Sequence, residues 1–354
     1  MMRKGWIGLL AAALLLAALP LPRTAEAEED PGVSARCAVL MGPEGEILWE
    51  KNARERSLIA STTKLMTALV TVRHSRMEER VTVPAACCGI EGSSMYLAPG
   101  EEYTVEQLLT GLLLASGNDA AETLALHCAG SEEGFVAWMN EEAARLGLKD
   151  SHFMNPHGLD EEGHYSTAAD LGRLMAACMG QPELAKILGR TDALIHNNSY
   201  VNHNKLLWRC PGCLGGKTGY TQAAGRCLVS CCEREGTRLY CVTLADPEDW
   251  ADQMALYDWG FARYVTRSVT ENLRYMLPVY GGEKAAISLR AEELPLFLPK
   301  DAALELRLEL PRFALAPIRA GSTLGLVTLL WDGEELGRAP LVAAESVGQI
   351  WSET

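Results

Sequence analysis

Alternating apolar and polar residues predict two groups of strands in the first part of the chain. The stretch "ARCAVLMGPEGEILWEKN" (35–52) places β-type runs on either side of a Gly-Pro-Glu-Gly turn, which is typical of a hairpin. Three short runs follow much later, at 215–220, 226–233 and 238–246, and turn-like pieces join them. Short sequential strands with such links favour an antiparallel meander.

A helical period predicts several helices between these strands. From 61 to 72 the apolar residues cover most of a helix circumference, so this helix is expected to be buried. The stretch 150–167 is polar and rich in turn formers, which predicts a long loop. Further helices are expected at 104–130, where "ASGND" interrupts the pattern, and at 131–147, 168–179 and 250–264.

Beyond residue 264 the pattern changes to a period of two. Leucines at 304, 306, 308 and 310 alternate with charged residues, which predicts a half-buried strand. A hairpin is expected around Asp332-Gly333. Residues 265–354 are therefore expected to form a small all-β domain that contains no catalytic cluster.

The first 27 residues have the features of a signal peptide. Arg3 and Lys4 precede an apolar stretch at 6–19, and "AEA" at 25–27 is a small-residue cleavage site. We therefore expect export to the cell envelope. The alternative is a retained anchor, although the stretch is short and no later one reaches the roughly 18 apolar residues that a membrane span needs.

The composition is that of an ordinary globular protein with an acidic surface. The chain has 354 residues, 48% of them hydrophobic and 22% charged, and this length suggests two domains. Its net charge of −14 becomes −16 without residues 1–27, because these hold three basic residues and one acidic residue. So acidic a chain is not expected to bind nucleic acid or an anionic membrane surface.

The cysteines do not indicate a disulfide scaffold. There are 11, but disulfide frameworks belong to short domains with small cores, so most are expected to be packing residues. Their odd number leaves at least one thiol unpaired in a monomer. Cys210 and Cys213 form the one close CxxC, where a local disulfide stays open, and their surroundings favour neither a zinc site nor a thioredoxin-like motif.

Candidate chemistry begins at "ASTTKLMTALV" (60–70), which places Ser61 and Lys64 three residues apart. At this spacing two side chains lie on the same face of a helix. A serine hydroxyl is a weak nucleophile until a base takes its proton, and a buried lysine with a lowered pKa can be that base. The alternative is a capping serine beside a lysine that extends to solvent.

Two further motifs favour the catalytic interpretation. Ser116 and Asn118 form an SxN motif that interrupts a predicted helix, and a KTG motif begins at Lys217 on a predicted strand. The order SxxK, SxN, KTG is the signature of penicillin-interacting serine acyl transferases. With "SGNDAAETLA", "NPHGLDEEGHYSTAADL", "NHNKLL" and "GGKTGYTQAAGRCLVS", the chain resembles the D-alanyl-D-alanine carboxypeptidases, low-molecular-weight penicillin-binding proteins of serine peptidase family S11.

This resemblance covers about residues 37–264, and the following β domain is also similar. It implies the α+β class. A penicillin-binding, serine β-lactamase-like transpeptidase domain at 28–264, with an antiparallel sheet and helices, is expected to precede the small all-β domain at 265–354.

The resemblance also implies a catalytic mechanism. Ser61 attacks the carbonyl between the last two D-alanines of a peptidoglycan stem pentapeptide, and neutral Lys64 is the general base. Ser116 relays a proton to the departing D-alanine amine, and water then hydrolyses the acyl-enzyme. A β-lactam acylates Ser61 by the same route.

The binding residues implied by the resemblance surround this nucleophile. The charge of Lys217 lowers the pKa of the base and helps to orient the substrate, Thr218 holds the terminal carboxylate, and Asn118 hydrogen-bonds the substrate amide. Backbone N–H groups of the nucleophile and of Tyr220 form the oxyanion hole. Gly219 lets the substrate approach the strand as an added β-like segment.

No metal or other cofactor is expected. His157, His164 and the acidic residues at 160–162 look like a metal cluster, but a loop of solvated charges is the commoner origin. The matching segment of the family is a structural loop, and the serine mechanism needs no metal.

Two departures from the family stand out. Many members carry an arginine shortly before the last helix of the first domain, which helps to bind the substrate carboxylate, whereas "DPEDWADQ" (246–253) has no basic residue. Carboxylate recognition is therefore expected to depend more on Thr218. Many members also end in an amphipathic anchor helix, but "AAESVGQIWSET" has two acids and no base, so membrane contact after signal cleavage is expected to be weak or absent.

Other functions stay open at this point. The same machinery can act as a D,D-endopeptidase on cross-links, which groove shape decides. A class A β-lactamase is disfavoured, because no glutamate between 130 and 200 has an asparagine four residues later. A non-catalytic penicillin-binding sensor or scaffold is the alternative of a different class, although a binder needs no base.

Overall fold

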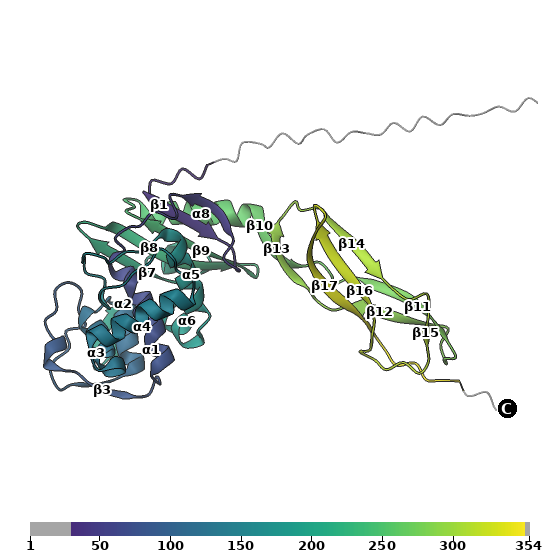
Figure 1. Cartoon of the computed structure of the whole chain (residues 1–354), viewed down its shortest axis with the longest axis horizontal. Coiled ribbons are helices and arrows are strands. Elements are labelled where there is room, and N and C mark those ends of the chain that lie inside the picture. The colour runs from purple at the N-terminus through teal and green to yellow at the C-terminus, as the bar shows by residue number, and fades with distance from the viewer. Residues whose placement is uncertain (1–29, 351–354) are drawn as a thin grey trace, which may run out of the picture. The chain divides into compact units, whose positions relative to one another are not determined.

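The computed structural model describes residues 30–350, and the predicted signal peptide at 1–27 lies outside the described residues. An α+β part with a five-stranded sheet precedes a β part with a six-stranded sheet (Figure 1). The predicted class, an α+β domain followed by a small all-β domain, is therefore confirmed.

The five-stranded sheet is antiparallel throughout and has the order β2-β1-β9-β8-β7. Its first two strands form the predicted hairpin and its last three form the predicted meander, so both predictions are confirmed. β7, which carries the KTG motif, lies at one edge of the sheet. The strands are β1 (Cys37–Met41), β2 (Ile47–Lys51), β7 (Cys213–Thr221), β8 (Gly225–Arg234) and β9 (Thr237–Leu244).

The predicted helices are present, and 104–130 divides into two helices at "ASGND", but the short helices η2, α6 and α7 were not predicted. Two short hairpins, β3 (Arg80–Thr82) with β4 (Glu102–Thr104) and β5 (Asp192–Ile195) with β6 (Asn198–Val201), were not predicted. The helices are η1 (Ala60–Thr63), α1 (Lys64–His74), η2 (Ala85–Cys87), α2 (Val105–Leu114), α3 (Asn118–Ala129), α4 (Glu132–Arg145), α5 (Ala168–Met179), α6 (Pro182–Leu188), α7 (Leu206–Arg209) and α8 (Asp249–Arg263).

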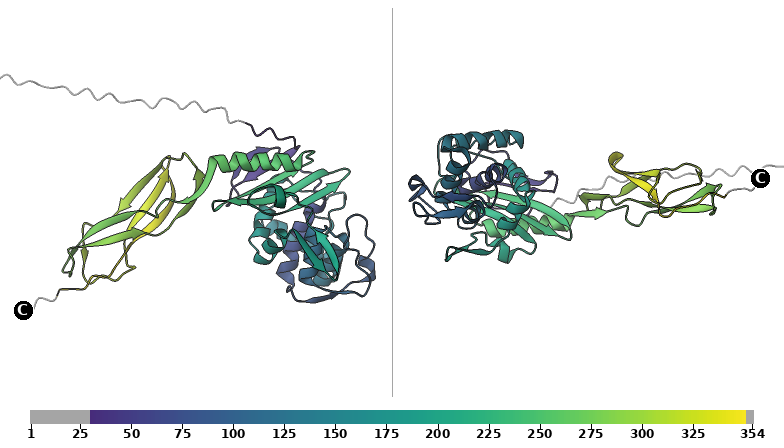
Figure 2. Two further views of the ribbon diagram at one scale, coloured as in Figure 1. Left: turned by 180° about the vertical axis from the view of Figure 1, so that it is seen from behind. Right: turned by 90° about the horizontal axis from the view of Figure 1, so that it is seen from below.

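Helices cover both faces of the sheet, because successive side chains of a strand point to opposite sides. Val39 belongs to the core shared with α1 and α5, whereas Leu40 belongs to the core shared with α8. Cys231 and Cys232 divide between the two cores in the same way. The result is three layers, with α8 and the short α7 beside one face of the sheet and α1 and α5 on the opposite face (Figures 1 and 2).

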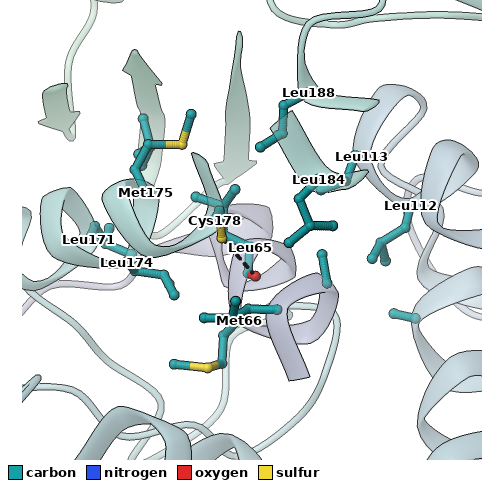
Figure 3. Packing of buried hydrophobic residues seen from close by; sticks show 14 of the residues in the cluster. Leu65, Met66, Leu112, Leu113, Leu171, Leu174, Met175, Cys178, Leu184 and Leu188 are labelled. Carbon is teal, nitrogen blue, oxygen red and sulfur yellow. Dashed lines mark hydrogen bonds between the residues drawn. The ribbon is translucent and has the colours of Figure 1, made fainter. Parts of the chain in front are cut away.

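The larger core surrounds α1. Figure 3 shows Leu65 and Met66 of α1 packed against side chains of α2, α5 and α6. Leu65 and Met66 are completely buried, and Cys178 of α5 donates a hydrogen bond to the Leu65 carbonyl at 3.4 Å. Burying an apolar side chain of this size contributes about 1.5–3 kcal/mol, so the first turn of α1 has a fixed position.

The β part has its own core and a sheet of order β14-β16-β17-β12-β11-β15, in which β11 and β15 are parallel. β16 and β17 form the predicted hairpin, with positive φ at Asp332 and Gly333, as a tight two-residue turn requires. The strands are β10 (Tyr264–Ser268), β11 (Arg274–Tyr280), β12 (Ala286–Ala291), β13 (Pro295–Pro299), β14 (Leu304–Glu309), β15 (Ala314–Leu315), β16 (Thr323–Trp331) and β17 (Glu334–Ala343).

The strand predicted from the alternating leucines is present as β14, but its predicted half-burial is wrong. Leu306 is 45% exposed and Leu308 is 41% exposed. β14 lies at the edge of the six-stranded sheet, where one flank has no neighbouring strand. A period of two thus predicted the strand correctly, whereas burial depended on its place in the sheet.

Within residues 30–350, no helix has both the length and the apolar character that crossing a membrane requires.

Candidate active site

Ser61 lies in the tight turn η1, directly before α1. Ala60 has a φ of 46°, a left-handed conformation that costs a non-glycine residue about 1–3 kcal/mol. Side-chain hydrogen bonds hold the turn: Thr62 Oγ1 donates to the Ile59 carbonyl, and Thr63 Oγ1 donates to the Ala60 carbonyl. Ser61 is partly exposed between buried neighbours, so this strained turn presents its hydroxyl to solvent.

Lys64 is completely buried, and its amine lies 2.8 Å from Ser61 Oγ. The same nitrogen donates to Asn118 Oδ1 at 2.6 Å and to the His157 carbonyl at 2.5 Å. Those two partners are pure acceptors and match the two hydrogens of a neutral amine, which leaves the lone pair for the Ser61 hydroxyl. Burial holds the pKa of Lys64 well below its ordinary value, and the charge of Lys217 lowers it further.

The loop at 150–167 packs against this nucleophile turn. Thr67 Oγ1 donates to the Pro156 carbonyl at 2.5 Å, beside the contact of His157 with the amine of Lys64. At Gly158, φ is +88° and a Cβ atom would lie 2.1 Å from the Ala60 carbonyl oxygen, so only glycine fits. The loop is therefore structural and supplies a backbone acceptor to the site.

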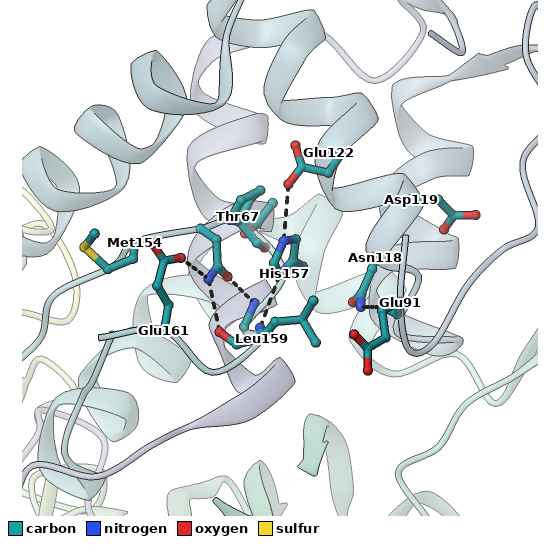
Figure 4. A network of polar contacts seen from close by, with 12 residues as sticks. Thr67, Glu91, Asn118, Asp119, Glu122, Met154, His157, Leu159 and Glu161 are labelled. Carbon is teal, nitrogen blue, oxygen red and sulfur yellow. Dashed lines mark hydrogen bonds and ion pairs between the residues drawn. The ribbon is translucent and has the colours of Figure 1, made fainter. Parts of the chain in front are cut away.

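Two histidines of this loop are held as neutral acceptors. The Met154 N–H donates to His164 Nδ1, so the other ring nitrogen carries the proton and donates to Thr63 Oγ1. The Leu159 N–H donates to His157 Nδ1, and the opposite nitrogen faces Glu122 (Figure 4). Burial, the largest cause in both rings, lowers the pKa of His164 to about 4 and that of His157 to about 3.

The histidines and acidic residues at 157–164 look like a metal cluster in the sequence, but those whose side chains form hydrogen bonds in the structure have different partners. Asp160 accepts a hydrogen bond from Thr221, and Glu161 accepts one from Asn155. The structure instead brings Glu122, Glu132 and His157 within 4.8 Å of one another, a grouping that sequence reasoning missed. Burial and the neighbouring Glu132 carboxylate raise the pKa of Glu122 to about 8, so the carboxyl pair retains a proton at neutral pH.

Ser116 and Lys217 form a second hydroxyl–amine pair, and Ser116 lines the same pocket as Ser61. Ser116 lies at the break between α2 and α3 with a φ of 61°. Lys217 of β7 donates to Ser116 Oγ at 2.9 Å and to the Thr218 carbonyl at 2.8 Å. Burial lowers the pKa of Lys217 to about 7.

Asn118 and Asp119 lie in the first turn of α3 and hold the loop at 91–97 in place. Asn118 donates to the Glu91 carbonyl at 2.5 Å, so both polar ends of its amide are occupied. It would reach a substrate amide only by exchanging one of these bonds. Asp119 accepts from Ser94 and from the backbone N–H groups of Met95 and Leu97, and sequence reasoning missed this buried carboxylate.

The KTG strand lies directly against the nucleophile turn. A Cβ atom at Gly219 would lie 2.9 Å from the Ile59 carbonyl oxygen and 3.0 Å from the Ser61 nitrogen. Gly219 therefore allows β7 to approach η1 closely, a packing reason that differs from the substrate approach expected from sequence. Thr218 is partly exposed and Tyr220 is 68% exposed beside it.

The nucleophile turn, the SxN segment and the KTG strand border a pocket of about 320 Å³. It brings the predicted residues Ser61, Ser116, Thr218, Gly219 and Tyr220 together, while Lys64, Asn118 and Lys217 are connected to it through hydrogen bonds. A groove of about 860 Å³ adjoins it. The lining residues that sequence reasoning did not predict are Ser93, His203, Lys205, Arg226, Asp249 and Trp250.

The thiols near β7 do not contribute to this pocket, and all 11 cysteines are unbridged. Cys210 and Cys213 are not bonded to each other. Instead, Cys210 Sγ lies 3.6 Å from Cys232 Sγ, in the core next to α8.

Comparison with known proteins gives a consistent result. A family model described as D-alanyl-D-alanine carboxypeptidase matches residues 24–248. The chain is 33% identical over 333 residues to D-alanyl-D-alanine carboxypeptidase DacF of Bacillus subtilis, covering 88% of this chain and 86% of that one. It is 32% identical to DacC of Escherichia coli, covering 91% and 88% of the two chains.

Solved structures show the same similarity. Penicillin binding protein 5 from Haemophilus influenzae is 31% identical, with a TM-score of 0.70, and the match covers 91% of this chain and 99% of that one. Penicillin binding protein 6B from Escherichia coli is 28% identical, with a TM-score of 0.71 and coverage of 89% and 96%.

Proposed function

Because the chain belongs to the D-alanyl-D-alanine carboxypeptidase family of serine peptidases, we propose that it removes the terminal D-alanine from peptidoglycan stem pentapeptides. The observation that carries this proposal is the buried Lys64 amine, 2.8 Å from the partly exposed Ser61 hydroxyl. A buried amine with a lowered pKa is a base at neutral pH, and the hydroxyl beside it becomes a nucleophile.

In the acylation step, Ser61 Oγ attacks the carbonyl carbon between the two D-alanines while its proton passes to Lys64. The developing oxyanion accepts hydrogen bonds from the N–H groups of Ser61 and Tyr220, each worth about 3 kcal/mol to the transition state. Collapse of the intermediate breaks the C–N bond. The proton reaches the departing D-alanine amine through Ser116, whose hydroxyl lies 2.9 Å from the Lys217 amine.

Water completes the cycle by hydrolysing the ester on Ser61. Lys64 takes a proton from the water and returns it to Ser61 Oγ as the acyl group leaves. A β-lactam acylates Ser61 by the same attack on its amide carbonyl. Substrate amide contacts fall to Asn118, in exchange for one of its present bonds, and Thr218 and Lys217 orient the terminal D-alanine.

The proposal includes a place of action and a domain organisation. Residues 1–27 are a signal peptide, 28–264 the D,D-peptidase domain and 265–354 a small C-terminal β domain. The enzyme works in the cell envelope, binds no nucleic acid, and has weak or no membrane contact after signal cleavage. The net charge, −14 for the whole chain and −16 without residues 1–27, supports the last two points.

Mass spectrometry of muropeptides tests the proposed reaction. A monomeric pentapeptide and a cross-linked dimer are incubated with the mature protein, with Ser61→Ala, and with Ser75→Ala as a matched control outside the site. We expect loss of one D-alanine from the pentapeptide with the wild type and the control, and no loss with Ser61→Ala. Cleavage of the dimer alone would identify an endopeptidase, and penicillin labelling without turnover would identify a binding protein.

A further inference from the structure

Arg226 brings a guanidinium group to the pocket of Ser61. It lies on β8, opposite Tyr220 of β7 in the strand register, and both residues line the pocket. The stretch 246–253 has no basic residue, and it contributes Asp249 and Trp250 to the same pocket. The pocket wall therefore contains an arginine even though that stretch lacks one.

Asp249 and Trp250 hold the Arg226 side chain in place. Arg226 Nη2 donates to both carboxylate oxygens of Asp249, at 2.7 and 2.9 Å, and the guanidinium carbon lies 5.6 Å from the centre of the Trp250 ring. The Asp249 side chain is 4% exposed, whereas that of Arg226 is 44% exposed. One nitrogen is thus fixed, and within residues 30–350 neither Nε nor Nη1 donates a hydrogen bond.

The proposed substrate has a carboxylate that suits this group. The terminal D-alanine carries it one residue beyond the bond that Ser61 attacks. Thr218 offers a neutral hydroxyl, and Lys217 is 1% exposed with its amine directed to Ser116. Among the lining residues, Arg226 and Lys205 are the cations, and only Arg226 is held by an aspartate and an aromatic ring.

We propose that Arg226 binds the terminal carboxylate of the substrate, with Asp249 and Trp250 as its positioning residues. This inference rests on the proposed function and specifies how that site selects its substrate. An arginine–carboxylate contact is stronger than a hydroxyl–carboxylate contact, because both partners are charged. Recognition thus depends on β8, the strand beside the KTG motif, as well as on Thr218.

The other end of β8 offers a matched control. Arg234 donates to Asp258 of α8 at 2.7 Å, and its guanidinium carbon lies 4.7 Å from the centre of the Phe261 ring. This arrangement repeats the arginine, aspartate and aromatic ring of Arg226, but Arg234 does not line the pocket. If such a trio only stabilised the fold, replacing Arg226 or Arg234 should have the same effect on activity.

Two thioesters with the same acyl-D-alanyl group test the inference. One has a thioglycolate leaving group with a free carboxylate, and the other is its methyl ester. Each enzymatic rate is divided by the spontaneous hydrolysis rate of the same ester, because the two leaving thiols differ in acidity. For wild type and Arg234→Gln we expect kcat/KM to favour the free carboxylate. Arg226→Gln should lower kcat/KM for the carboxylate roughly 10- to 100-fold, as loss of a charged hydrogen bond predicts, and much less for the methyl ester. Arg226→Lys should restore part of the preference, and Asp249→Asn should raise KM for the carboxylate more than it lowers kcat.

Each contrary result has a distinct meaning. If Arg226→Gln lowers both rates equally, or if Lys205→Gln alone removes the preference, Arg226 is not the carboxylate ligand. Equal wild-type rates on the two esters would also overturn the inference while the serine mechanism stands. If neither ester is hydrolysed faster by the wild type than by Ser61→Ala, the proposed function itself fails.

Discussion

Buried ionisable side chains distinguish the part with the five-stranded sheet from the part with the six-stranded sheet. The part with the five-stranded sheet buries Lys64 and Lys217 almost completely, at 0% and 1% exposure. In residues 265–350 the buried polar side chains are those of Thr270 and Thr328, and none is charged. A buried amine costs several kcal/mol unless its surroundings compensate, so its presence marks a region shaped by chemistry as well as by stability.

Replacing the buried base gives the largest expected effect. Lys64→Met fills the same space with an apolar side chain and removes the proton acceptor of Ser61. We expect the rate of acylation by a labelled penicillin to fall about 10²- to 10⁴-fold, the usual contribution of a general base. Thermal stability should not fall in proportion, because a methionine needs no polar partner in the core.

The comparison also defines the control for this prediction. Lys149 is exposed, and Lys149→Met should leave the acylation rate within a factor of two of wild type. If Lys64→Met acylates within tenfold of the wild-type rate, the buried amine is not the base. The buried amines of the first part would then affect its stability and not its chemistry.

Acid should weaken the first part through its histidines, since all seven lie between residues 74 and 203. His164 accepts the Met154 N–H, and burial lowers its folded pKa from 6.5 to about 4. Between these values the unfolded chain binds a proton that the folded chain refuses. The free energy of unfolding should therefore fall as pH drops from about 6.5 to 4, by up to about 3 kcal/mol, and His164 contributes no further slope below that range.

Urea unfolding at pH 6.5 and 4.5 checks this window. His164→Gln should unfold more easily at pH 6.5 but lose less stability on acidification than the wild type does. His152→Gln changes an exposed histidine of the same loop and is the matched control. An unchanged acid slope in His164→Gln would show that another group governs the loss.

Sequence reasoning succeeded where side-chain type decides the outcome. The SxxK, SxN and KTG motifs converge on one pocket, and α5 has the predicted bounds of Ala168–Met179. It missed the His157 carbonyl that accepts from Lys64, because a backbone oxygen has no residue-type signal. It also missed Arg226, whose place in the pocket follows from the register of β7 and β8.

The β part shows what the sequence pattern could not predict, which is the burial of a strand. Period-two leucines predicted β14, but the exposure of Leu306 depends on which strand lies beside it, and neighbours in the sheet are far apart in sequence. The pairing of β14 with β16 leaves one flank of β14 without a strand. Local pattern therefore predicted the element, and only the tertiary arrangement determined its burial.

The smallest expected effect lies on this edge strand. Leu306→Ala should lower the free energy of unfolding by about 1 kcal/mol or less, since nearly half of its surface is already in water. Leu289→Ala, at a completely buried position of the same sheet, should cost about 2–5 kcal/mol. Neither variant should change the acylation rate of Ser61 more than twofold, because residues 265–350 contribute no side chain to its pocket. Chemical unfolding and penicillin acylation measured on both variants decide the point: a slower acylation in Leu289→Ala would mean that the uncharged sheet supports the site after all.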